Sequence, residues 1–575
     1  MTSSRTPLLA DSRRRSLDSD HAAEEEDAAL HGRAASPGRS PRLREWILFL
    51  WALLATATVI ILAVIVQHNQ QTSHSSPKPS SDKRNLIFMV SDGMGPASLS
   101  LTRSFRQYID DLPIDDTLVL DQHFWGTSRT RSSSSLVTDS AAGATAFSCG
   151  KKSYNGAIAV DPDHNPCGTV LEAAKRAGYT TGLVVTTDVT DATPASFAAH
   201  VWYRFQNDEI ALQEIGEGVL GRTVDLIFGG GRCRFLPNGV EGSCRADDVD
   251  VRGIAQDKHG WSWADSRAGF DAMAGGKNVS LPALGLFAPA DVPFEVDRRN
   301  MADVYPSLSE MASTAIKALE EATKDSEKGF FLMIEGSRID HAGHFNDPAA
   351  QVREVLEYDK TFKLVVDFLE ESETEGVLVA TSDHETGGLA TAYQRPGELP
   401  AYYWHPSVLA NSNASSEHAA RLLSQYVASV PDDVNKSDLK KWINTNILQQ
   451  RMGIDDAQDT ELDAIVSNPA LALPVFSKMI SSRARIGWST AGHSAVDVNI
   501  YSSGGPAVDH LRGNVENTDI GKFLRSYLDV EDHVADITKE LGKKMEIKPP
   551  VMGVRIQEVA VGLGEALHLD LSYEP

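Results

Sequence analysis

Residues 330–344 read FFLMIEGSRIDHAGH, and this stretch joins a buried strand to a candidate metal-binding helix. The apolar run Phe330–Ile334 is typical of a strand that is covered on both faces of a sheet. Glu335 follows where that strand should end. Asp340 and His344 are four residues apart, so both side chains lie on one face of a helix that begins here. The stretch predicts an α/β protein with polar ligands at the end of a strand.

Two other apolar runs end in the same way. Residues 86–90 lead into SDG, which contains Asp92, and residues 377–381 lead into SDHE, which contains Asp383 and His384. In open α/β sheets, ligands collect at the carboxyl ends of the strands. We therefore expect these acidic and histidine side chains to meet at one edge of the sheet.

The residue types in these clusters fit zinc. Zinc binds imidazole nitrogen and carboxylate oxygen, and a site without cysteine is typical of an open catalytic centre. Asp340 and His344 can hold one ion, adjacent Asp383 and His384 can hold a second, and the late, glycine-flanked His493 can complete the first site. For any single pair the alternative is a capping aspartate or a hydrogen-bonded histidine. Three clusters, each just after a predicted strand, favour a metal site.

A serine opens the small-residue run VTDSAAGAT at residues 137–145. A helix that begins at Ser140 would present backbone N–H groups and the positive end of its dipole to an incoming dianion. Ser140 is therefore a candidate nucleophile, activated by metal coordination instead of by a histidine base. The alternative is that Asp139 only caps a tightly packed helix.

The rest of the chain alternates apolar runs with helical stretches, as in an α/β sheet. Further strands are predicted at Gly182–Thr186, Asp225–Phe228 and Val498–Tyr501, and a 3.6-residue apolar stripe predicts a helix over residues 349–371. Residues 388–488 lack this alternation, so we interpret them as an inserted cap.

Composition excludes several classes of function. The chain has 575 residues, 42% of them hydrophobic, and a formal net charge of −25. Its apolar content excludes a disordered protein, and its length exceeds one compact core. The acidic excess argues against nucleic acid as a specific partner, because binding phosphates needs a basic surface. Small anionic substrates are compatible with this charge, since bound metal ions can reverse the local field.

The N-terminal region predicts a membrane anchor. Residues 1–46 contain equal numbers of arginines and acidic residues and few aromatic ones, which is typical of a disordered tail. Residues 47–66 (ILFLWALLATATVIILAVIV) carry no charge and are long enough to span a bilayer. Arginines are concentrated on the N-terminal side of this segment, so the positive-inside rule predicts a single-pass, type II topology. The tail would lie in the cytosol, and the linker at 67–83 and the body would lie in a lumen or outside the cell. A buried core helix and a cleaved signal peptide are the alternatives.

Two features fit such a body. Candidate N-glycosylation triplets begin at Asn278, Asn413 and Asn435. The four cysteines form two short-range pairs that suit disulfides in an oxidising compartment, namely Cys149 with Cys167 and Cys233 with Cys244. Three connectivities are possible in principle, and free buried thiols are the alternative.

Together these motifs resemble the alkaline phosphatases. The resemblance rests on VTDSAAGAT at 137–145, SDGMG at 91–95, the Asp340/His344 pair, DHE at 383–385 and the late His493, in the order of that family from about residue 85 to residue 528. With its uncleaved anchor, the chain is most similar to the fungal vacuolar members. The resemblance implies a three-layer sandwich around a central, mostly parallel sheet, with a catalytic domain at 84–530 and a C-terminal tail at 531–575.

The resemblance also implies a role for each site residue. One zinc ion would be held by Asp340, His344 and His493, and the other by Asp92, Asp383 and His384. One magnesium ion would contact Asp92, Thr193, Glu335 and, mainly through its waters, Asp191. Arg204 would grip phosphate and Asp139 would orient it. His341 stands where the bacterial form has lysine, and it either meets phosphate through a water or packs beside Asp340.

The activity implied is hydrolysis of small phosphate monoesters at alkaline pH, over a broad substrate range, through a phosphoserine at Ser140. The resemblance further implies a homodimer in the vacuolar membrane, with the plasma membrane or another secretory-pathway membrane as the alternative. A sulfatase or phosphodiesterase of the same superfamily is the alternative activity, but the chain lacks the C/S-x-P-x-R motif of sulfatases, and Arg204 would crowd a diester. A catalytically inactive binding ectodomain predicts losses among the ligands, whereas every expected ligand is present.

Overall fold

The computed structural model describes residues 46–58, 83–431 and 435–549. The chain divides into two units, residues 1–80 and 81–575. In the first unit the described part is one helix, Trp46–Thr58. The other residues of the predicted tail, anchor and linker, except Lys83, lie outside the described residues.

Membrane-spanning helices were sought among the described residues only. Among them, no single helix is both long and apolar enough to be a membrane span. One bent pair of helices, Asp459–Ser467 with Pro469–Ala484, passes the test by length and composition alone. The anchor at residues 47–66 stays a prediction.

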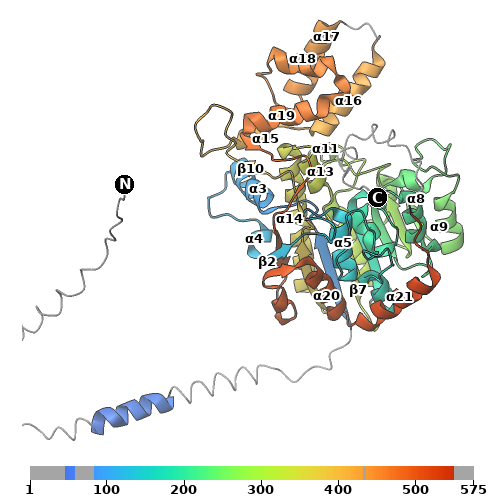
Figure 1. Cartoon of the computed structure of the whole chain (residues 1–575), viewed down its shortest axis with the longest axis vertical. Helices are drawn as coiled ribbons and strands as arrows, with labels where there is room; N and C mark the ends of the chain where they lie inside the picture. Colours follow the sequence, from blue (N-terminus) through green and yellow to red (C-terminus); the bar gives the residue numbers. More distant parts are fainter. Residues whose placement is uncertain (1–45, 59–82, 432–434, 550–575) are drawn as a thin grey trace, which may run out of the picture. The chain divides into compact units, whose positions relative to one another are not determined.

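A ten-stranded sheet lies at the centre of the described part of the second unit (Figure 1), in the order β14-β2-β13-β8-β1-β7-β3-β4-β6-β5. The strands are β1 Arg84–Val90, β2 Phe124–Arg129, β3 Thr180–Asp188, β4 Leu226–Gly230, β5 Ser262–Ala264, β6 Ala283–Leu286, β7 Phe330–Glu335, β8 Glu375–Thr381, β13 Val498–Ser502 and β14 Gly513–Glu516. Neighbours pair in parallel except β13, which is antiparallel to β2 and β8. The α/β class and the mostly parallel sheet are confirmed, and each of the six predicted strands is present.

The three strands that precede the site motifs lie side by side. β1 pairs with β7 on one side and β8 on the other, and Val90 is in register with both Glu335 and Thr381. β1 is buried at every position from Asn85 to Val90, because helices cover both faces of the sheet. The carboxyl ends of the three strands therefore meet at one edge.

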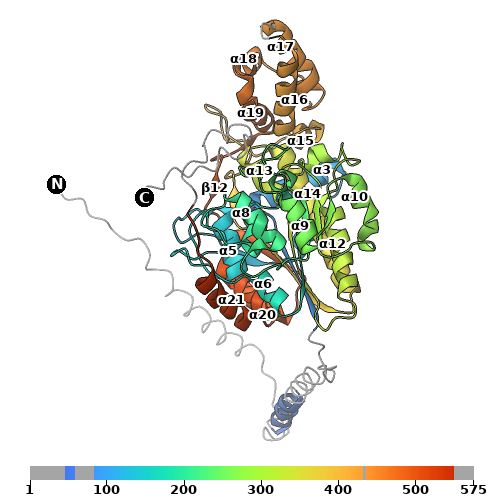
Figure 2. The same cartoon turned by 90° about the vertical axis from the view of Figure 1, so that its right-hand side faces the viewer.

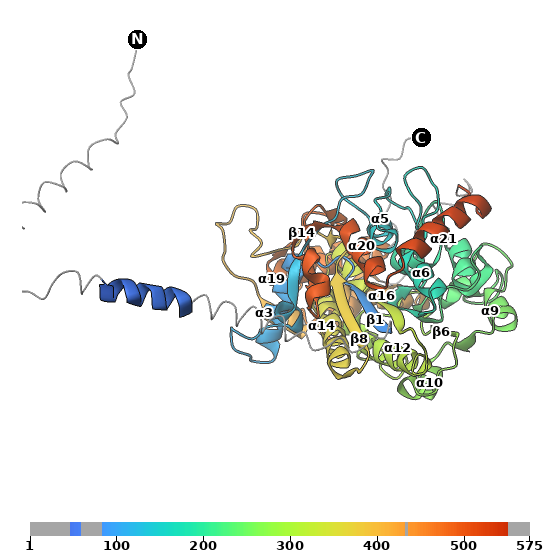
Figure 3. The ribbon, with the colours of Figure 1, turned by 90° about the horizontal axis from the view of Figure 1, so that it is seen from below.

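Two layers of helices cover the sheet (Figures 2 and 3). Successive side chains of β1 point to opposite faces. Phe88 packs with Phe147 in one core, beneath α5 Ser140–Cys149, α6 Val170–Arg176, α20 Asn517–Tyr527 and α21 Glu531–Lys544. Ile87 packs with Phe362 in the other, beneath α12 Leu308–Ala322 and α14 Pro348–Glu371. The arrangement is a three-layer sandwich, and α14 matches the predicted helix at 349–371.

Helix α21 lies in the segment 531–575 that we predict to be a tail. Val534, Ile537 and Leu541 are buried in the same core as α6 and α20. Packed structure therefore continues beyond residue 530.

The other elements connect the sheet to its edge loops and to the cap. The other helices of the body are α3 Pro96–Ile109, α4 Val119–Gln122, α7 Ala192–Ala198, α8 Asn207–Leu212, α9 Val251–His259, α10 Arg267–Ala272, α11 Glu295–Arg298 and α13 Arg338–His344. Two small ribbons are formed by β9 Glu385–Thr386 with β12 His493–Ser494 and by β10 Ala390–Thr391 with β11 Ile486–Gly487.

Residues 388–488 are mostly helical and form the cap seen at the top of Figures 1 and 2. Its helices are α15 Pro406–Asn411, α16 Ser416–Ser429, α17 Lys436–Trp442, α18 Asp459–Ser467 and α19 Ala472–Ala484. Leu423 and Phe476 belong to its apolar core, which also takes in Phe105 of α3 and Ala349 of α14. The cap is thus packed onto the helices beside the sheet edge.

Candidate active site

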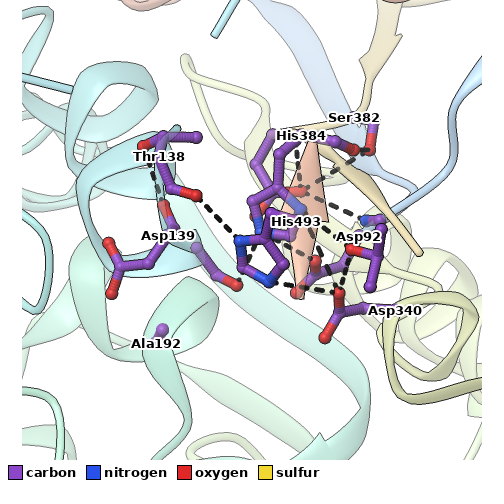
Figure 4. A network of polar contacts seen from close by, with 12 residues as sticks. Asp92, Thr138, Asp139, Ala192, Asp340, Ser382, His384 and His493 are labelled. Atoms are coloured by element: carbon purple, nitrogen blue, oxygen red, sulfur yellow. Dashed lines mark hydrogen bonds and ion pairs between the residues drawn. The ribbon is translucent and has the colours of Figure 1, made fainter. Parts of the chain in front are cut away.

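Backbone contacts hold the motif-bearing turns together. Ser91 N donates a hydrogen bond to Thr381 O at 3.0 Å, and Gly336 N donates to Val90 O at 2.9 Å, so the turns after the three central strands begin beside one another. In the β9–β12 ribbon His493 is opposite Thr386. This pairing brings His493 next to the turn that carries the Asp383–His384 motif (Figure 4).

Asp92, Asp383 and His384 form the first of two ligand groups. Nε2 of His384 lies 3.2 Å from Oδ2 of Asp383 and 3.6 Å from Oδ1 of Asp92. Both of these oxygens are buried and have no hydrogen-bond partner. Thr386 Oγ1 lies 3.2 Å from Nδ1 of His384. The three ligand atoms therefore face a common point.

The second group comprises Asp340, His344 and His493. Nε2 of His344 lies 3.2 Å from Oδ2 of Asp340 and 3.0 Å from Nε2 of His493. The Nδ1 atoms of His344 and His493 meet the backbone carbonyls of Ala491 and Thr138, at 2.5 Å and 2.8 Å. These contacts orient both rings so that Nε2 faces the carboxylate, as in metal-binding histidines.

Two glycines allow the ligand turns to approach each other. Gly93 has φ +76°, and a Cβ there would lie 2.5 Å from Cα of Asp340. Gly143 sits in α5, and a Cβ there would lie 2.9 Å from Cβ of Asp383. Both positions exclude a larger residue without displacement of a ligand.

Burial and like charges oppose the ionised form of two ligand carboxyl groups, those of Asp92 and Asp383. Burial, followed by the charge of Asp383, raises the pKa of Asp92 well above its usual value. Burial and Asp340 raise the pKa of Asp383 to about 7. Burial lowers the pKa of His493 to about 4 and that of His384 well below its usual value. Both imidazoles are therefore neutral at pH 7, which is the form that binds a metal.

These donors fit two divalent cations. The ligand atoms of each group lie within 4.8 Å of one another. The unpartnered Oδ1 of Asp92 and Oδ2 of Asp383 would be costly to bury, and a cation would both pair them and neutralise their repulsion. Neutral imidazole and carboxylate are the ligand types that zinc accepts.

Ser140 lies beside the first group. It is the first residue of α5 and is 1% exposed, and its Oγ lies 3.0 Å from Nε2 of His384. Asp139 Oδ1 accepts a hydrogen bond from Ala142 N at 3.0 Å, so Asp139 does cap the helix. The helix cap and the contact of Ser140 with His384 coexist, because they use atoms of different residues.

Arg204 is held by two acidic side chains. It donates to Oδ1 of Asp191 at 2.9 Å and to Oδ2 of Asp139 at 3.4 Å. Burial would lower the pKa of Arg204, but Asp191 and Asp139 raise it, so the guanidinium stays charged. Gly156 N also donates to Oδ2 of Asp139, at 2.8 Å. Asp139 therefore links the start of α5 to the arginine.

Asp191 and Glu335 lie near enough to Asp92 for their charges to raise its pKa, and Thr193 follows Asp191 by two residues. Asp191 caps α7 through Ala192 N, and Thr193 lies in its first turn with 1% exposure. Glu335 ends β7. Burial raises the pKa of Glu335 to about 8, with Asp191 among the charges that act on it. Oxygen ligands of this kind suit magnesium.

His341 makes a contact that neither sequence-based alternative contains. Its Nδ1 lies 3.4 Å from Oδ2 of Asp291. Burial would lower the pKa of His341, but this hydrogen bond and the charge of Asp291 raise it to about 9. Asp291 also accepts a hydrogen bond from Asp188 N at 2.9 Å.

Sequence reasoning missed two supporting residues, Thr386 and Asp291. Thr386 Oγ1 donates to Oδ1 of Asp340. Its position two residues after His384 was a usable signal, whereas no motif marks Asp291.

The remaining candidates lie outside the ligand groups. Both predicted disulfides are confirmed, Cys149–Cys167 and Cys233–Cys244. The glycosylation candidates Asn278, Asn413 and Asn435 are all exposed.

Two adjoining three-ligand groups, one of which contacts a buried serine, and a charged arginine held by the neighbouring Asp139 are the features of a metal-dependent hydrolase of phosphate esters. Residues 83–530 match the protein family described as alkaline phosphatase. The chain is 51% identical to the repressible alkaline phosphatase of Saccharomyces cerevisiae over 500 residues, which cover 84% of this chain and 88% of that protein. It is 45% identical to the alkaline phosphatase of Schizosaccharomyces pombe over 523 residues, or 90% and 94% of the two chains.

A solved structure agrees with these sequence matches. The crystal structure of Thermus thermophilus alkaline phosphatase superposes with a TM-score of 0.65 at 27% identity, and covers 80% of this chain and 97% of that one. The chain belongs to the alkaline phosphatase family. The prediction that it is an enzyme of this class, a phosphoric monoester hydrolase, is confirmed.

Proposed function

We propose that the chain hydrolyses small phosphate monoesters through a phosphoserine on Ser140, with an alkaline optimum and a broad range of leaving alcohols. The observation that carries this proposal is the 3.0 Å contact between Oγ of buried Ser140 and His384 of one three-ligand group, whose ring stacks on His493 of the other group at 3.5 Å between centroids. An inactive binding ectodomain would not need a complete set of ligands around a candidate nucleophile.

The site would hold two zinc ions and one magnesium ion. The two ligand groups already described would each bind one zinc ion. Magnesium would be held by oxygen atoms of Asp92, Asp191, Thr193 and Glu335. When bound, the metals would lower the pKa of a nearby hydroxyl or water and offset negative charge on the reacting oxygens.

Ser140 would act twice in the reaction. First a bond forms from its Oγ to phosphorus as the bond to the alcohol oxygen breaks, and Ser140 gives up its proton while the alcohol gains one from solvent. Next a water oxygen attacks the same phosphorus and loses a proton as the bond to Oγ breaks, Oγ of Ser140 regains a proton, and inorganic phosphate leaves. The N-terminus of α5 directs backbone N–H groups toward the incoming dianion.

Arg204 would bind two non-reacting phosphoryl oxygens. Its planar fork can donate to both oxygens at once, whereas lysine is a point donor. Asp139 and Asp191 hold the guanidinium at 3.4 Å and 2.9 Å. The same grip explains why a monoester fits better than a diester, whose second substituent would occupy one of those oxygens.

For the whole protein we propose a type II membrane protein of the vacuole that acts as a homodimer. The support is the apolar segment at 47–66 and the resemblance to fungal vacuolar members. Exposure of the three candidate asparagines supports a glycosylated lumenal body. Protease added to sealed vesicles should remove only about the first 46 residues, and digestion of the large body would contradict this topology.

The activity is tested on the full chain in detergent. We expect two zinc ions and one magnesium ion per chain by plasma mass spectrometry, and hydrolysis of a chromogenic phosphate monoester that a chelator abolishes. The matching diester and sulfate ester serve as controls and should react far more slowly. A chain that stays inactive after both metals are restored would contradict the proposal.

A further inference from the structure

Three consecutive residues at the start of α16, Ser415 to Glu417, are among the cap residues that contact the body. Ser415 N and Oγ donate to Asp297 at 3.0 Å and 2.6 Å. Ser416 N donates to Oδ2 of Asp347 at 2.7 Å. Oε2 of Glu417 accepts a hydrogen bond from Arg338 at 2.9 Å. The three body residues belong to different segments, so the contact joins the cap helix to several elements at once.

Two of these contacts bracket the helix that carries a ligand group. Arg338 is the first residue of α13, the helix of Asp340 and His344. Asp347 lies just after α13 and caps α14 through Ala349 N and Ala350 N. The start of α16 therefore contacts both ends of the α13 segment.

Helix α13 has little support of its own. It is seven residues long, and no side chain caps its N-terminus. A helix of this length gains little stability from its own hydrogen bonds, so its position depends on contacts with its surroundings.

Arg338 supplies such contacts at the start of the helix. It is 3% exposed, its guanidinium lies 3.7 Å from the ring centroid of Phe294, and it donates to Val292 O at 3.0 Å. Glu417, at 43% side-chain exposure, is its carboxylate partner from the cap. The pair is therefore anchored on the body side and adjustable on the cap side.

We propose that the Arg338–Glu417 pair positions α13, and through it the ligands Asp340 and His344, so that cap docking sets how firmly this ligand group holds its metal. Arg338 and Glu417 are positioning residues and contact no reacting atom. The inference rests on the proposed zinc-dependent hydrolysis. Residues that orient metal ligands commonly change metal affinity by about 10-fold to 100-fold when they are replaced.

The test compares Glu417→Gln, Glu417→Ala and Arg338→Lys with the unaltered full chain loaded with zinc and magnesium. Asp463→Asn is the matched control, because it removes a 2.7 Å ion pair with Lys440 that lies entirely within the cap. We measure zinc release to a colorimetric chelator, kcat and KM for a phosphate monoester, and the thermal unfolding midpoint.

We expect Glu417→Ala to release about one zinc ion per chain roughly tenfold faster, with kcat lowered about tenfold and KM changed less than about twofold. Glu417→Gln keeps one acceptor oxygen, so its zinc release rate and its kcat should lie between those of Glu417→Ala and those of the unaltered chain. In the Arg338→Lys/Glu417→Ala double variant, kcat should fall and zinc release should speed up no more than in the worse single variant, because the pair acts as a unit.

Zinc release and kcat that match the Asp463→Asn control in all variants would overturn the inference, and so would a lowered unfolding midpoint with unchanged zinc release. These outcomes are distinct from failure of the proposed function, in which the unaltered chain itself would bind no zinc or hydrolyse no monoester.

Discussion

Oγ of Ser140 lies 3.0 Å from Nε2 of His384, yet this pair does not form a serine–histidine dyad of the acid–base type. Such a histidine is oriented through its second nitrogen by a carboxylate. Here Nδ1 of His384 lies 3.2 Å from the hydroxyl of Thr386, and Nε2 also faces Asp383. Burial and His493 lower the pKa of His384 strongly, so the ring is a poor base. The contact instead fits two ligands that approach one cation.

Ser140→Ala should therefore abolish covalent labelling by radioactive phosphate monoester while the chain keeps both zinc ions. We expect kcat to fall by at least about 1000-fold, because a missing nucleophile removes the covalent pathway. Ser148→Ala is the control, since Ser148 is buried in the same helix. Labelling that persists on another residue would contradict the assignment, and it is measured by peptide mapping after an acid quench.

Arg204→Lys should weaken binding of inorganic phosphate by about 10-fold to 100-fold, because the lysine keeps the charge but loses the two-pronged grip. The inhibition constant of phosphate measures this directly. Arg234→Lys is the control: Arg234 also pairs with a partly buried carboxylate, that of Asp188, at 3.1 Å. Equal inhibition constants for the unaltered chain and Arg204→Lys would mean that the arginine does not bind phosphate.

Gly93→Ala should lose zinc from the group of Asp340, because the added Cβ would lie 2.5 Å from Cα of Asp340. Gly260→Ala separates the backbone effect from this collision: Gly260 has φ +71°, close to +76° at Gly93, and open space around its Cβ position. The control should cost about 1 kcal/mol of stability and keep both zinc ions. Zinc content by mass spectrometry distinguishes the two variants, and equal contents would argue against a packing role for Gly93.

Long, continuous apolar runs made the centre of the sheet predictable. β1, β7 and β8 are buried on both faces, so their sequences have no polar interruption. β2 and β14 were not predicted, because they are half-exposed strands near an edge and read FWGTSR and GNVE. β5 and β6 are only three and four residues long. Such short or mixed segments give no period-two signal.

The ligand groups were predictable where spacing alone brings residues together, as for Asp340 with His344. Contacts between distant segments were predictable only where a strand end or a motif marks the residues. His341, which contacts Asp291, lies 50 positions after it in the chain, and Glu417 lies 79 positions after its partner Arg338. Only the packing of the cap and the sheet edge creates these pairs, so no local pattern records them.

Asp297, which holds the start of the cap helix through Ser415, should make stability depend on pH. Burial raises its pKa to about 7, from 3.8, although the hydrogen bonds from Ser415 oppose the rise. A group with a raised folded-state pKa binds its proton more tightly when folded, so its stabilising contribution is complete below about pH 4 and is lost as pH rises through 7. At about 1.4 kcal/mol per pKa unit, the change in the free energy of unfolding is at most about 4 kcal/mol.

The variant Asp297→Asn keeps the shape of the side chain but removes its titration. The stability of the unaltered chain minus that of Asp297→Asn should therefore fall between pH 4 and pH 8, and thermal unfolding midpoints across this range measure it. The exposed Asp463→Asn serves as the control, and a difference that is constant with pH would show that Asp297 ionises in the folded chain as it does in the unfolded one.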